Sequence, residues 1–375
     1  MTFEKQKTAI IGTGMISPVY FNRLQRLNII DLVACADIRT ERAVASAEKF
    51  GVVAKTNEEI FADPDIKLVI NTTYPLSHYE VAKAALLAGK HVYTEKMVAE
   101  SVEQMDELIA LAEEKGLYFG GAPDTFLCGA AQTARQLIDA GVIGTPTVAE
   151  AFLSRSYHHE RNYTGDYKRF AFCRHGGIIF DMGSYYLSEL VFLLGSIDKV
   201  FGFAQTRDAD RKYQNPKCPL FGEDMTVETP NNVTGSLLFK NGTIATITMS
   251  SEAGTSSNRF VIHGTDGMID LGDPNQFSGE IKVYNKAGKE SIIQTNFAFF
   301  GEDFRGLGAA DAMYALKNGR KPRCSGELSR HVLEAALGIC ESGENGTVYE
   351  MRTTCERPEP FKPGYTEYPE LVLDI

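Results

Sequence analysis

The first third of the chain alternates between short apolar segments and helix-like segments, and this alternation limits the possible folds more than any other feature. The apolar segments have the length of buried strands, and Gly51, Gly89 and Gly116 follow helix-like segments at positions where helices commonly end. Strands that alternate with helices form a parallel sheet with right-handed crossovers. We expect strands at residues 9–11, 32–36, 68–70, 91–93 and 117–119.

The pattern changes after about residue 125, where several strand-like runs follow one another without helices between them. Three Xaa-Gly pairs, at residues 241–242, 266–267 and 287–288, separate such runs, and pairs of this kind form the tight turns that join antiparallel strands. The chain of 375 residues is also too long for one ordinary core. We therefore expect an α/β domain with a parallel sheet at residues 1–125, followed by an α+β domain at residues 126–375 with a mostly antiparallel open sheet.

The first expected strand continues into a glycine-rich segment at residues 12–18 with the sequence Gly-Thr-Gly-Met-Ile-Ser-Pro. Gly12 permits a tight turn and Gly14 allows the backbone to approach a pyrophosphate, while Pro18 suits the first turn of a helix whose N-terminus attracts phosphate. Ser17 stands where the dinucleotide-binding fingerprint has its third glycine. Because a strand precedes the segment and a helix follows it, we expect the N-terminal domain to be a dinucleotide-binding Rossmann domain.

Asp37 ends the second expected strand, 25 residues after Gly12 and close to the place of a ribose-binding carboxylate. A carboxylate at this place would meet the 2′-phosphate of NADP as a like charge. Arg39 is the counter-argument, because its guanidinium could pair with that phosphate. A solvated surface arginine is the commoner outcome, and we therefore expect NAD as the cofactor, with NADP as the less favoured alternative.

The composition excludes several classes of partner. A net charge of −11 opposes binding to nucleic acid or to an anionic membrane. No apolar segment reaches the roughly 18 residues of a membrane span, and the N-terminal residues contain no signal-peptide core. The seven cysteines form no Cys-x-x-Cys pair, which argues against a zinc knuckle or a disulfide framework. We expect a cytoplasmic protein without a nucleic-acid or membrane partner.

Three further segments carry motifs in the first half of the chain. They are residues 69–75 (Val-Ile-Asn-Thr-Thr-Tyr-Pro) with His78 after them, residues 94–96 (Thr-Glu-Lys), and residues 176–186 (Gly-Gly-Ile-Ile-Phe-Asp-Met-Gly-Ser-Tyr-Tyr). Together with the glycine-rich segment they resemble, in content and order, the glucose–fructose oxidoreductase/inositol dehydrogenase/MocA family. The second half of the chain is similar mainly in pattern. The resemblance implies a nicotinamide-dependent oxidoreductase but says little about its substrate.

The chain departs from the family at two places. The family motif Glu-Lys-Pro is Glu95-Lys96-Met97 here, so the proline that would fix the backbone after the lysine is missing. The family motif Asp-x-x-x-His is Asp181-x-x-x-Tyr185, as in the glucose–fructose and dihydrodiol branches. The resemblance implies that the cofactor is contacted by Gly12, Gly14, Met15, Ile16, Asp37, Ile38, Arg39, Asn71, Thr72, Thr73, Pro75, His78, Glu95 and Lys96.

The candidate catalytic residues are Lys96, Asp181 and Tyr185. Lys96 follows a parallel strand at its carboxyl end, where open α/β sheets bind ligands, and Asp181 and Tyr185 share one face of a helix start. Removing a hydroxyl proton at neutral pH requires a base, and an ammonium group at ~4 Å could lower the pKa of Tyr185 by at most about three units. Lys96 could itself carry the proton. A third alternative makes Asp181–Lys96 a structural ion pair and Tyr185 a core aromatic residue.

Further candidates are expected to bind the substrate. The segment Tyr157-His158-His159-Glu160 contains metal-binding residue types, but it lacks the helical i, i+4 histidine pair of a zinc helix, and we expect no metal. The family resemblance places this segment among substrate-contacting loops. The expected substrate-binding residues are therefore Lys96, Asp124, His158, His175, Asp181 and Tyr185.

These observations favour an NAD-dependent oxidoreductase that transfers hydride between nicotinamide and a secondary alcohol of a sugar, a sugar derivative or a cyclitol. One alternative is a redox-neutral enzyme, glycosidase-like or transhydrogenating, with a tightly held nucleotide. Another is a non-catalytic regulator on the same fold, although the presence of Lys96, Asp181 and Tyr185 argues against it. We expect a homodimer or homotetramer that assembles through the sheet of the C-terminal domain.

Overall fold

The computed structural model describes residues 5–156 and 176–362, which form two units. The first unit contains the described residues up to Gly129 together with residues 296–330 and 358–362. The remaining described residues form the second unit. The chain therefore divides differently from the expected single boundary near residue 125, because two later segments return to the first unit. Tyr118 donates its hydroxyl hydrogen bond to the carbonyl of Cys324 (2.6 Å), which ties one returning segment to the N-terminal sheet.

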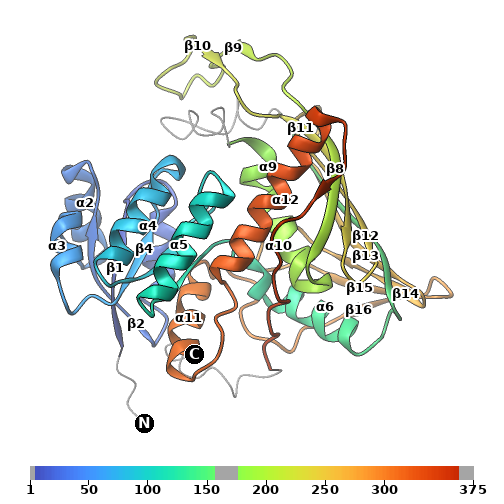
Figure 1. The fold of residues 1–375 in the computed structure, drawn as a ribbon, viewed down its shortest axis with the longest axis horizontal. Coiled ribbons are helices and arrows are strands. Elements are labelled where there is room, and N and C mark those ends of the chain that lie inside the picture. Colours follow the sequence, from blue (N-terminus) through green and yellow to red (C-terminus); the bar gives the residue numbers. More distant parts are fainter. Residues whose placement is uncertain (1–4, 157–175, 363–375) are drawn as a thin grey trace. The chain divides into compact units, whose positions relative to one another are not determined.

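The sheet of the first unit has six parallel strands in the order β3-β2-β1-β4-β5-β6, and helices flank it (Figure 1). The order reverses direction at β1, since β2 lies on one side of it and β4 on the other. In doubly wound sheets this reversal point is where ligands bind. The expected parallel Rossmann sheet is confirmed. The strands are β1 (Gln6–Ile11), β2 (Ile30–Ala36), β3 (Val53–Ala54), β4 (Leu68–Asn71), β5 (His91–Thr94) and β6 (Phe119–Gly121).

Local sequence signals fix the ends of the first unit's helices. Gly51, Gly89 and Gly116 adopt positive φ angles of 71°, 78° and 64° within two residues of the ends of helices, as expected. Ser101 caps one helix by accepting a hydrogen bond from the N–H of Gln104 (3.3 Å). The helices are α1 (Ser17–Leu24), α2 (Thr40–Phe50), α3 (Asn57–Ala62), η1 (Pro75–Ser77), α4 (His78–Leu87), α5 (Val102–Glu114), η2 (Thr125–Leu127) and the returning α11 (Leu307–Lys317).

The second unit contains a nine-stranded sheet in the order β16-β15-β14-β13-β7-β12-β11-β8-β17. Every neighbouring pair is antiparallel except β7 and β12, which are parallel, so the expected mostly antiparallel sheet is confirmed. The three Xaa-Gly pairs form turns of hairpins in this sheet. The strands are β7 (Pro146–Ser156), β8 (Ile197–Gln205), β11 (Asn232–Phe239), β12 (Ile244–Ala253), β13 (Ser257–Gly264), β14 (Gly267–Leu271), β15 (Ile281–Asn285), β16 (Glu290–Ile293) and β17 (Tyr349–Glu350).

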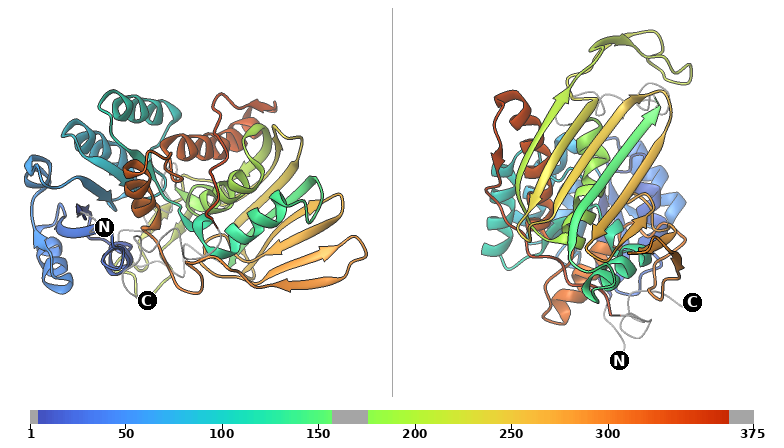
Figure 2. Two further views of the ribbon diagram at one scale, coloured as in Figure 1. Left: turned by 90° about the horizontal axis from the view of Figure 1, so that it is seen from below. Right: turned by 90° about the vertical axis from the view of Figure 1, so that its right-hand side faces the viewer.

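Helices cover one face of this sheet, whereas the right-hand view of Figure 2 shows the other face without a helix on it in the described part of the chain. Every residue of α10 is buried, which makes this helix the centre of the second core. The outer face carries exposed apolar side chains, among them Phe152, Phe203 and Ile244. The helices of the second unit are α6 (Gly129–Asp139), α9 (Gly177–Asp181), α10 (Gly183–Leu194) and α12 (Gly326–Asn345), of which α6 and α12 begin in residues of the first unit.

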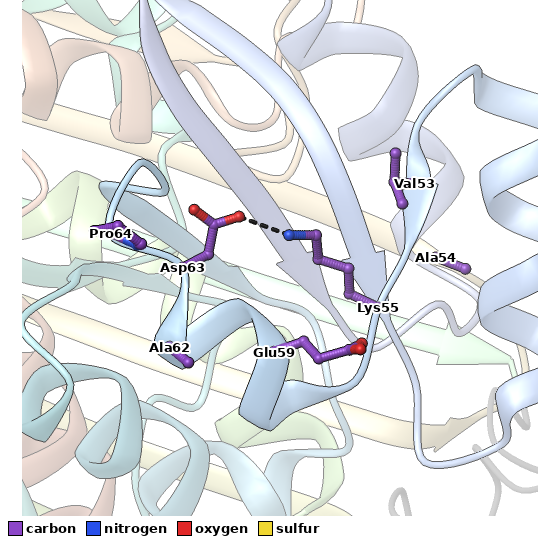
Figure 3. Close-up of a pocket in the computed structure, with 7 residues that line it drawn as sticks. All are labelled: Val53, Ala54, Lys55, Glu59, Ala62, Asp63 and Pro64. Atoms are coloured by element: carbon purple, nitrogen blue, oxygen red, sulfur yellow. Dashed lines mark hydrogen bonds and ion pairs between the residues drawn. The ribbon is translucent and has the colours of Figure 1, made fainter.

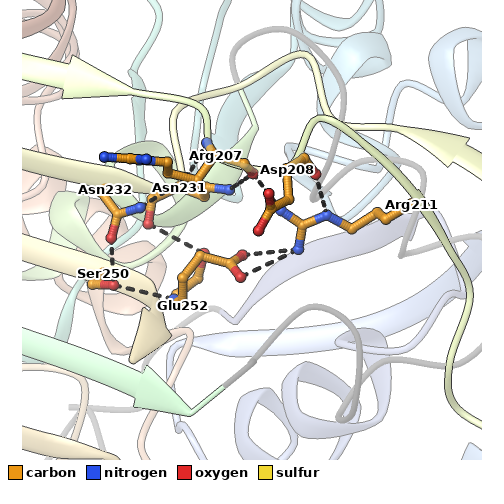
Figure 4. Close-up of polar contacts among 8 residues, drawn as sticks. Arg207, Asp208, Arg211, Asn231, Asn232, Ser250 and Glu252 are labelled. Carbon is orange, nitrogen blue, oxygen red and sulfur yellow. Dashed lines mark hydrogen bonds and ion pairs between the residues drawn. The ribbon is translucent and has the colours of Figure 1, made fainter. Parts of the chain in front are cut away.

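Between β8 and β11 the chain forms an arm with a hairpin of its own, β9 (Asp210–Lys212) and β10 (Asp224–Thr226). A small apolar cluster stabilises it, formed by Tyr213, Cys218, Met225 and Val227. At its base, both carboxylate oxygens of Glu252 accept hydrogen bonds from Nη1 of Arg211, at 3.1 and 3.2 Å (Figure 4). The sequence pattern does not predict this arm, because no periodic hydrophobic run marks it.

Candidate active site

Four neighbouring strands of the first unit end at the same level, and their next residues share one edge of the sheet. In the strand order β2-β1-β4-β5, Ala36 pairs with Ile11, Ile11 with Asn71, and Asn71 with Thr94. The segments that follow these strands hold Asp37, the glycine-rich loop, Thr72-Thr73 and Glu95-Lys96. The parallel sheet thus brings together four motifs that lie far apart in the sequence.

The glycine-rich loop packs directly against the segment after β4. Gly12 has a φ of +97°, and a Cβ at this position would lie 2.6 Å from backbone atoms of Thr72 and Thr73. The Thr72 hydroxyl donates to the carbonyl oxygen of Gly12 at 2.6 Å. Only glycine satisfies both the backbone angle and this close approach, so the tight turn expected at Gly12 is present.

The loop also leaves room for a pyrophosphate. A Cβ at Gly14 would meet nothing within 4 Å, so the backbone is open on that side. Helix α1 begins after Ile16 without a side-chain cap and without an acidic residue in its first turn, so its dipole is free to attract an anion. The first-turn N–H groups of Ser17 and Val19 donate to the carbonyls of Gly14 and Ile16. The hydroxyl of Ser17, the residue in place of the third glycine, donates to the Gly14 carbonyl (2.8 Å) and braces the loop.

The carboxylate of Asp37 accepts three hydrogen bonds, two of them from this loop. Its Oδ2 accepts from the N–H and from the hydroxyl of Thr13, and its Oδ1 accepts from the N–H of Arg39 (2.9 Å). Ile38 and Arg39 are exposed beside it, and Met15 is exposed on the loop. The carboxylate therefore has a fixed orientation next to the loop, which fits the ribose of a dinucleotide.

Asn71 and Thr73 shape the segment after β4. The buried Oδ1 of Asn71 accepts from the Thr73 hydroxyl at 2.7 Å, and its Nδ2 donates to the carbonyl of His78 (3.0 Å). Pro75 begins the short helix η1 that leads to His78. The Asn71 side chain therefore holds the loop together.

His78 connects two of the loops instead of pointing to solvent. Its Nδ1 lies 2.7 Å from the carbonyl oxygen of Met97, and its Nε2 lies 3.2 Å from that of Thr73. Burial lowers the pKa of His78, which favours the neutral ring. The peptide bond between Lys96 and Met97 is cis, although methionine replaces the family's proline. His78 thus holds the segment that follows Lys96.

Glu95 holds the same segment from the other side. Its Oε2 accepts from the N–H of Lys96 at 3.0 Å, and its Oε1 accepts from the hydroxyl of Tyr20 at 2.7 Å. Tyr20 was not a candidate in the sequence, because its place in α1 is that of an ordinary core aromatic residue. Only its hydrogen bond to a residue 75 positions later reveals the connection.

Asp124, one of the expected substrate-binding residues, is hydrogen-bonded to a returning segment of the first unit. It is 1% exposed, and its Oδ2 accepts hydrogen bonds from the N–H groups of Gly306 (2.9 Å) and Gly308 (3.0 Å) at the start of α11. Burial raises the pKa of Asp124 to about 6. This carboxylate anchors a returning segment whose proximity the local sequence pattern could not reveal.

Asp181 and Tyr185 lie at the junction of two helices in the second unit. Asp181 ends α9, Tyr185 lies in the first turn of α10, and both side chains are buried. The single expected helix start is therefore two helices, joined at Met182. Met182 keeps right-handed helical backbone angles (φ −94°, ψ −34°), so the four-residue spacing still favours one common side.

The double glycine before α9 lies against a side chain from the end of the arm. Gly177 has a φ of +77°, and a Cβ there would lie 2.7 Å from side-chain atoms of Thr229. The Thr229 hydroxyl donates to the carbonyl oxygen of Gly176 at 2.6 Å. The glycines therefore make room for Thr229, which joins the end of the arm to the helix that carries Asp181.

The remaining candidate residues and one pocket of the first unit do not contribute to the geometry of this site. His158 and His175, together with the segment 157–160, lie outside the described residues. In the ranges that the structure does describe, no group of three His, Cys, Asp or Glu side chains could hold a metal ion, and no helix is long and apolar enough to cross a membrane. A pocket lined by residues between Val53 and Pro64 (Figure 3) contains none of the candidate residues.

Two models of one protein family match the chain. Residues 6–120 match the model described as an oxidoreductase family with an NAD-binding Rossmann fold, and residues 131–270 match the GFO/IDH/MocA C-terminal domain. The chain belongs to the GFO/IDH/MocA family of oxidoreductases. Its first unit thus contains an NAD-binding Rossmann fold.

Individual relatives agree with this family. An uncharacterized oxidoreductase of Schizosaccharomyces pombe is 33% identical over 51% of this chain and 52% of its own length, so the match spans about half of that relative. The 1,5-anhydro-D-fructose reductase of Ensifer adhaerens is 24% identical over 92% of this chain and 98% of its own. The structure of a levoglucosan dehydrogenase in complex with NADH and L-sorbose is similar in fold, with a TM-score of 0.83, 20% identity, and coverage of 93% of this chain and 99% of that one.

Proposed function

We propose that this protein is an NAD-dependent dehydrogenase that transfers hydride between nicotinamide and a secondary alcohol of a sugar, a sugar derivative or a cyclitol. The observation that carries the proposal is the common strand edge in the first unit. There, Asp37, the glycine-rich loop and Glu95-Lys96 follow neighbouring strands that end at one level. This edge combines a dinucleotide loop with an amine that can act on a hydroxyl group.

The proposal assigns the cofactor to the first unit. The dipole at the start of α1 and the open backbone at Gly14 would hold the pyrophosphate, and Asp37 would accept from the ribose hydroxyls. A bound nicotinamide supplies the acceptor or donor of hydride. The fixed Asp37 carboxylate supports NAD over NADP, because a 2′-phosphate would bring a second negative charge to it.

The protein itself must handle the hydroxyl proton. Lys96 is one candidate, because the bonds to Glu95 and the contact of His78 with Met97 fix the backbone on both sides of it. Tyr185 is the other, with Asp181 beside it in sequence at the start of α10. Lys96, Asp181 and Tyr185 remain the residues that the family resemblance assigns to the substrate.

A dehydrogenase screen tests the proposal. Purified protein is incubated with NAD or NADP and a panel of sugars, anhydrosugars and cyclitols, and NADH absorbance is followed. We expect NAD-dependent turnover of at least one panel member, and its loss in Lys96→Ala. Absence of turnover together with nucleotide that stays bound through purification would favour the redox-neutral alternative. Absence of both turnover and nucleotide binding would contradict the proposal.

We also propose that the outer face of the nine-stranded sheet forms a homodimer or homotetramer interface. Phe152, Phe203 and Ile244 are exposed on β7, β8 and β12, and exposed apolar groups on one face commonly mark an interaction surface. A second copy of the same sheet would cover them. Light scattering on the wild type and on Phe203→Ser tests this: a monomeric wild type would contradict it.

A further inference from the structure

A buried tyrosine of α1 is linked to the segment that holds Lys96. Ser17, Tyr20, Phe21 and Leu24 are the buried residues of α1, and their spacing forms the face that packs inward. Packing alone would be satisfied by phenylalanine at position 20. The hydroxyl of Tyr20 instead donates a hydrogen bond of 2.7 Å to Oε1 of Glu95.

The partner of this hydroxyl is a nearly buried carboxylate. Glu95 is 6% exposed and Tyr20 is 0% exposed, so water cannot readily replace a lost hydrogen bond between them. The other oxygen, Oε2, accepts from the backbone N–H of Lys96 at 3.0 Å. The Glu95 carboxylate therefore accepts one hydrogen bond from the Tyr20 side chain and one from the Lys96 backbone. These two hydrogen bonds together fix the orientation of the carboxylate.

We propose that Tyr20 is a positioning residue for Lys96: its hydroxyl fixes the Glu95 carboxylate, and Glu95 fixes the backbone from which the lysine side chain projects. The inference rests on the proposed function, in which Lys96 acts on the substrate. Because Tyr20 lies in the helix whose N-terminus is assigned to the pyrophosphate, the same link places Lys96 relative to the bound nucleotide.

Tyr20→Phe removes the hydroxyl and little else. The matched control is Tyr118→Phe, because Tyr118 is also buried in the first unit and donates its hydroxyl bond to a backbone carbonyl, that of Cys324. Both variants lose one buried hydrogen bond, but only the bond from Tyr20 is made to Glu95. A purely structural role would lower the melting temperature in both and leave the reaction unchanged in both.

The measurements are kcat, KM, the pH profile of kcat, NADH affinity by fluorescence, and the melting temperature, with a substrate from the screen above. For Tyr20→Phe we expect kcat to fall roughly 10- to 100-fold and the pH profile to shift, with NADH affinity within about threefold of wild type. Tyr118→Phe should keep the kcat and pH profile of the wild type. A Tyr20→Phe enzyme with wild-type kcat and pH profile would overturn the proposal.

A double-mutant cycle with Glu95→Gln tests whether Tyr20 acts through Glu95. If it does, Tyr20→Phe should lower kcat much less in the Glu95→Gln background than in the wild type. Full additivity of the two effects would contradict the proposed route.

A readout independent of turnover separates this proposal from the proposed function. Acetylation of Lys96 by an activated acetate ester is followed over pH by mass spectrometry in the NADH-bound protein, with the exposed Lys115 as internal reference. Tyr20→Phe should change the rate profile at Lys96 but not at Lys115, even if no sugar or cyclitol is turned over. An unchanged Lys96 profile would overturn the positioning role, whereas a changed profile without turnover would count against the proposed function only.

Discussion

Asp37 and Thr13 are joined by two hydrogen bonds, because one carboxylate oxygen of Asp37 accepts from both the backbone N–H (2.7 Å) and the hydroxyl (3.0 Å) of Thr13. Thr13 lies between the two glycines of the loop assigned to the pyrophosphate. The acidic side chain is thus tied to the loop itself, and it cannot turn away without breaking both bonds.

This tie leads to a prediction about cofactor choice. NADH should bind at least about tenfold more tightly than NADPH, because a 2′-phosphate near a fixed carboxylate adds a like-charge contact that can cost several kcal/mol. Fluorescence titration with both reduced cofactors measures the ratio. Asp37→Ser should reduce it, since Arg39 could then pair with the phosphate. Equal or reversed affinity in the wild type would show that Asp37 does not select the cofactor.

The second prediction concerns catalysis. Lys96→Ala should abolish turnover and leave NADH affinity nearly intact, because the phosphates and ribose are assigned to the loop and to Asp37. Lys115→Ala, at an exposed position, is the control and should behave as wild type. Retained turnover in Lys96→Ala would mean that the active site is elsewhere. A large loss of NADH affinity would instead mean that the main role of Lys96 is to bind the cofactor.

Tyr185→Phe distinguishes the two candidate bases. If Tyr185 carries the proton, removal of its hydroxyl should lower kcat on the order of 10²- to 10⁴-fold and remove one ionisation from the pH profile. If Lys96 carries the proton, the loss should be much smaller and the ionisation should remain. Steady-state kinetics over the accessible pH range therefore assigns the base.

The fourth prediction concerns pH and stability at Asp124. Burial raises its pKa to about 6 in the folded protein, compared with about 3.9 in an unfolded chain. The folded state therefore holds the proton more tightly, and the free energy of unfolding should fall as pH rises from about 4 to about 6. A pKa difference of one unit corresponds to about 1.4 kcal/mol. The ionised Asp124 should therefore lower the free energy of unfolding by on the order of 3 kcal/mol above pH 6.

Asp124→Asn tests the predicted fall in the free energy of unfolding as pH rises. The amide oxygen can still accept from Gly306 and Gly308, and the group has no charge to bury, so the variant should lack this part of the pH dependence. Urea denaturation at several pH values measures the free energy of unfolding of the variant and of the wild type. The value for the variant minus the value for the wild type should increase from pH 4 to pH 6. A constant difference would mean that Asp124 titrates as an exposed carboxyl does; the exposed Glu113→Gln is the control.

Local patterns predicted much of the fold, and the reason can be seen at particular residues. Gly51 and Ser101 act within one or two turns of chain, so their helix-ending and helix-starting roles need no tertiary information. The edge that gathers Asp37 and Lys96 was also predictable, since parallel strands place their carboxyl ends together.

Contacts between distant segments were not predictable in the same way. The hydrogen bond that Asp124 accepts from Gly306 comes from a segment 182 residues later in the chain. Tyr20 has the pattern of a core residue, and only the structure shows that its hydroxyl donates to Glu95. The two-residue strand β3 is too short to show a period. The arm around Tyr213 forms its small core from residues without a regular spacing.

The last prediction concerns Gly177, where a side chain would destabilise the protein in two ways, through the backbone angle and through a collision. Alanine there must adopt a φ near +77°, and its Cβ would also collide with Thr229 and with the carbonyl oxygen of Pro230 (2.9 Å). Gly141 supplies the matched control in the same unit, since it has a similar φ of +73° but a Cβ there would meet nothing within 4 Å. Gly141→Ala should therefore show the cost of the backbone angle alone, roughly 1–2 kcal/mol.

Gly177→Ala should cost more than Gly141→Ala, by roughly 1–3 kcal/mol, because the collision displaces either Thr229 or the start of α9. Since α9 carries Asp181, turnover should fall as well, while NADH affinity, assigned to the first unit, should stay the same. Thr229→Ala removes the colliding side-chain atoms and should restore part of both losses in the double variant. Equal stability of Gly177→Ala and Gly141→Ala by urea denaturation would show that Thr229 yields freely and does not hold the helix that carries Asp181.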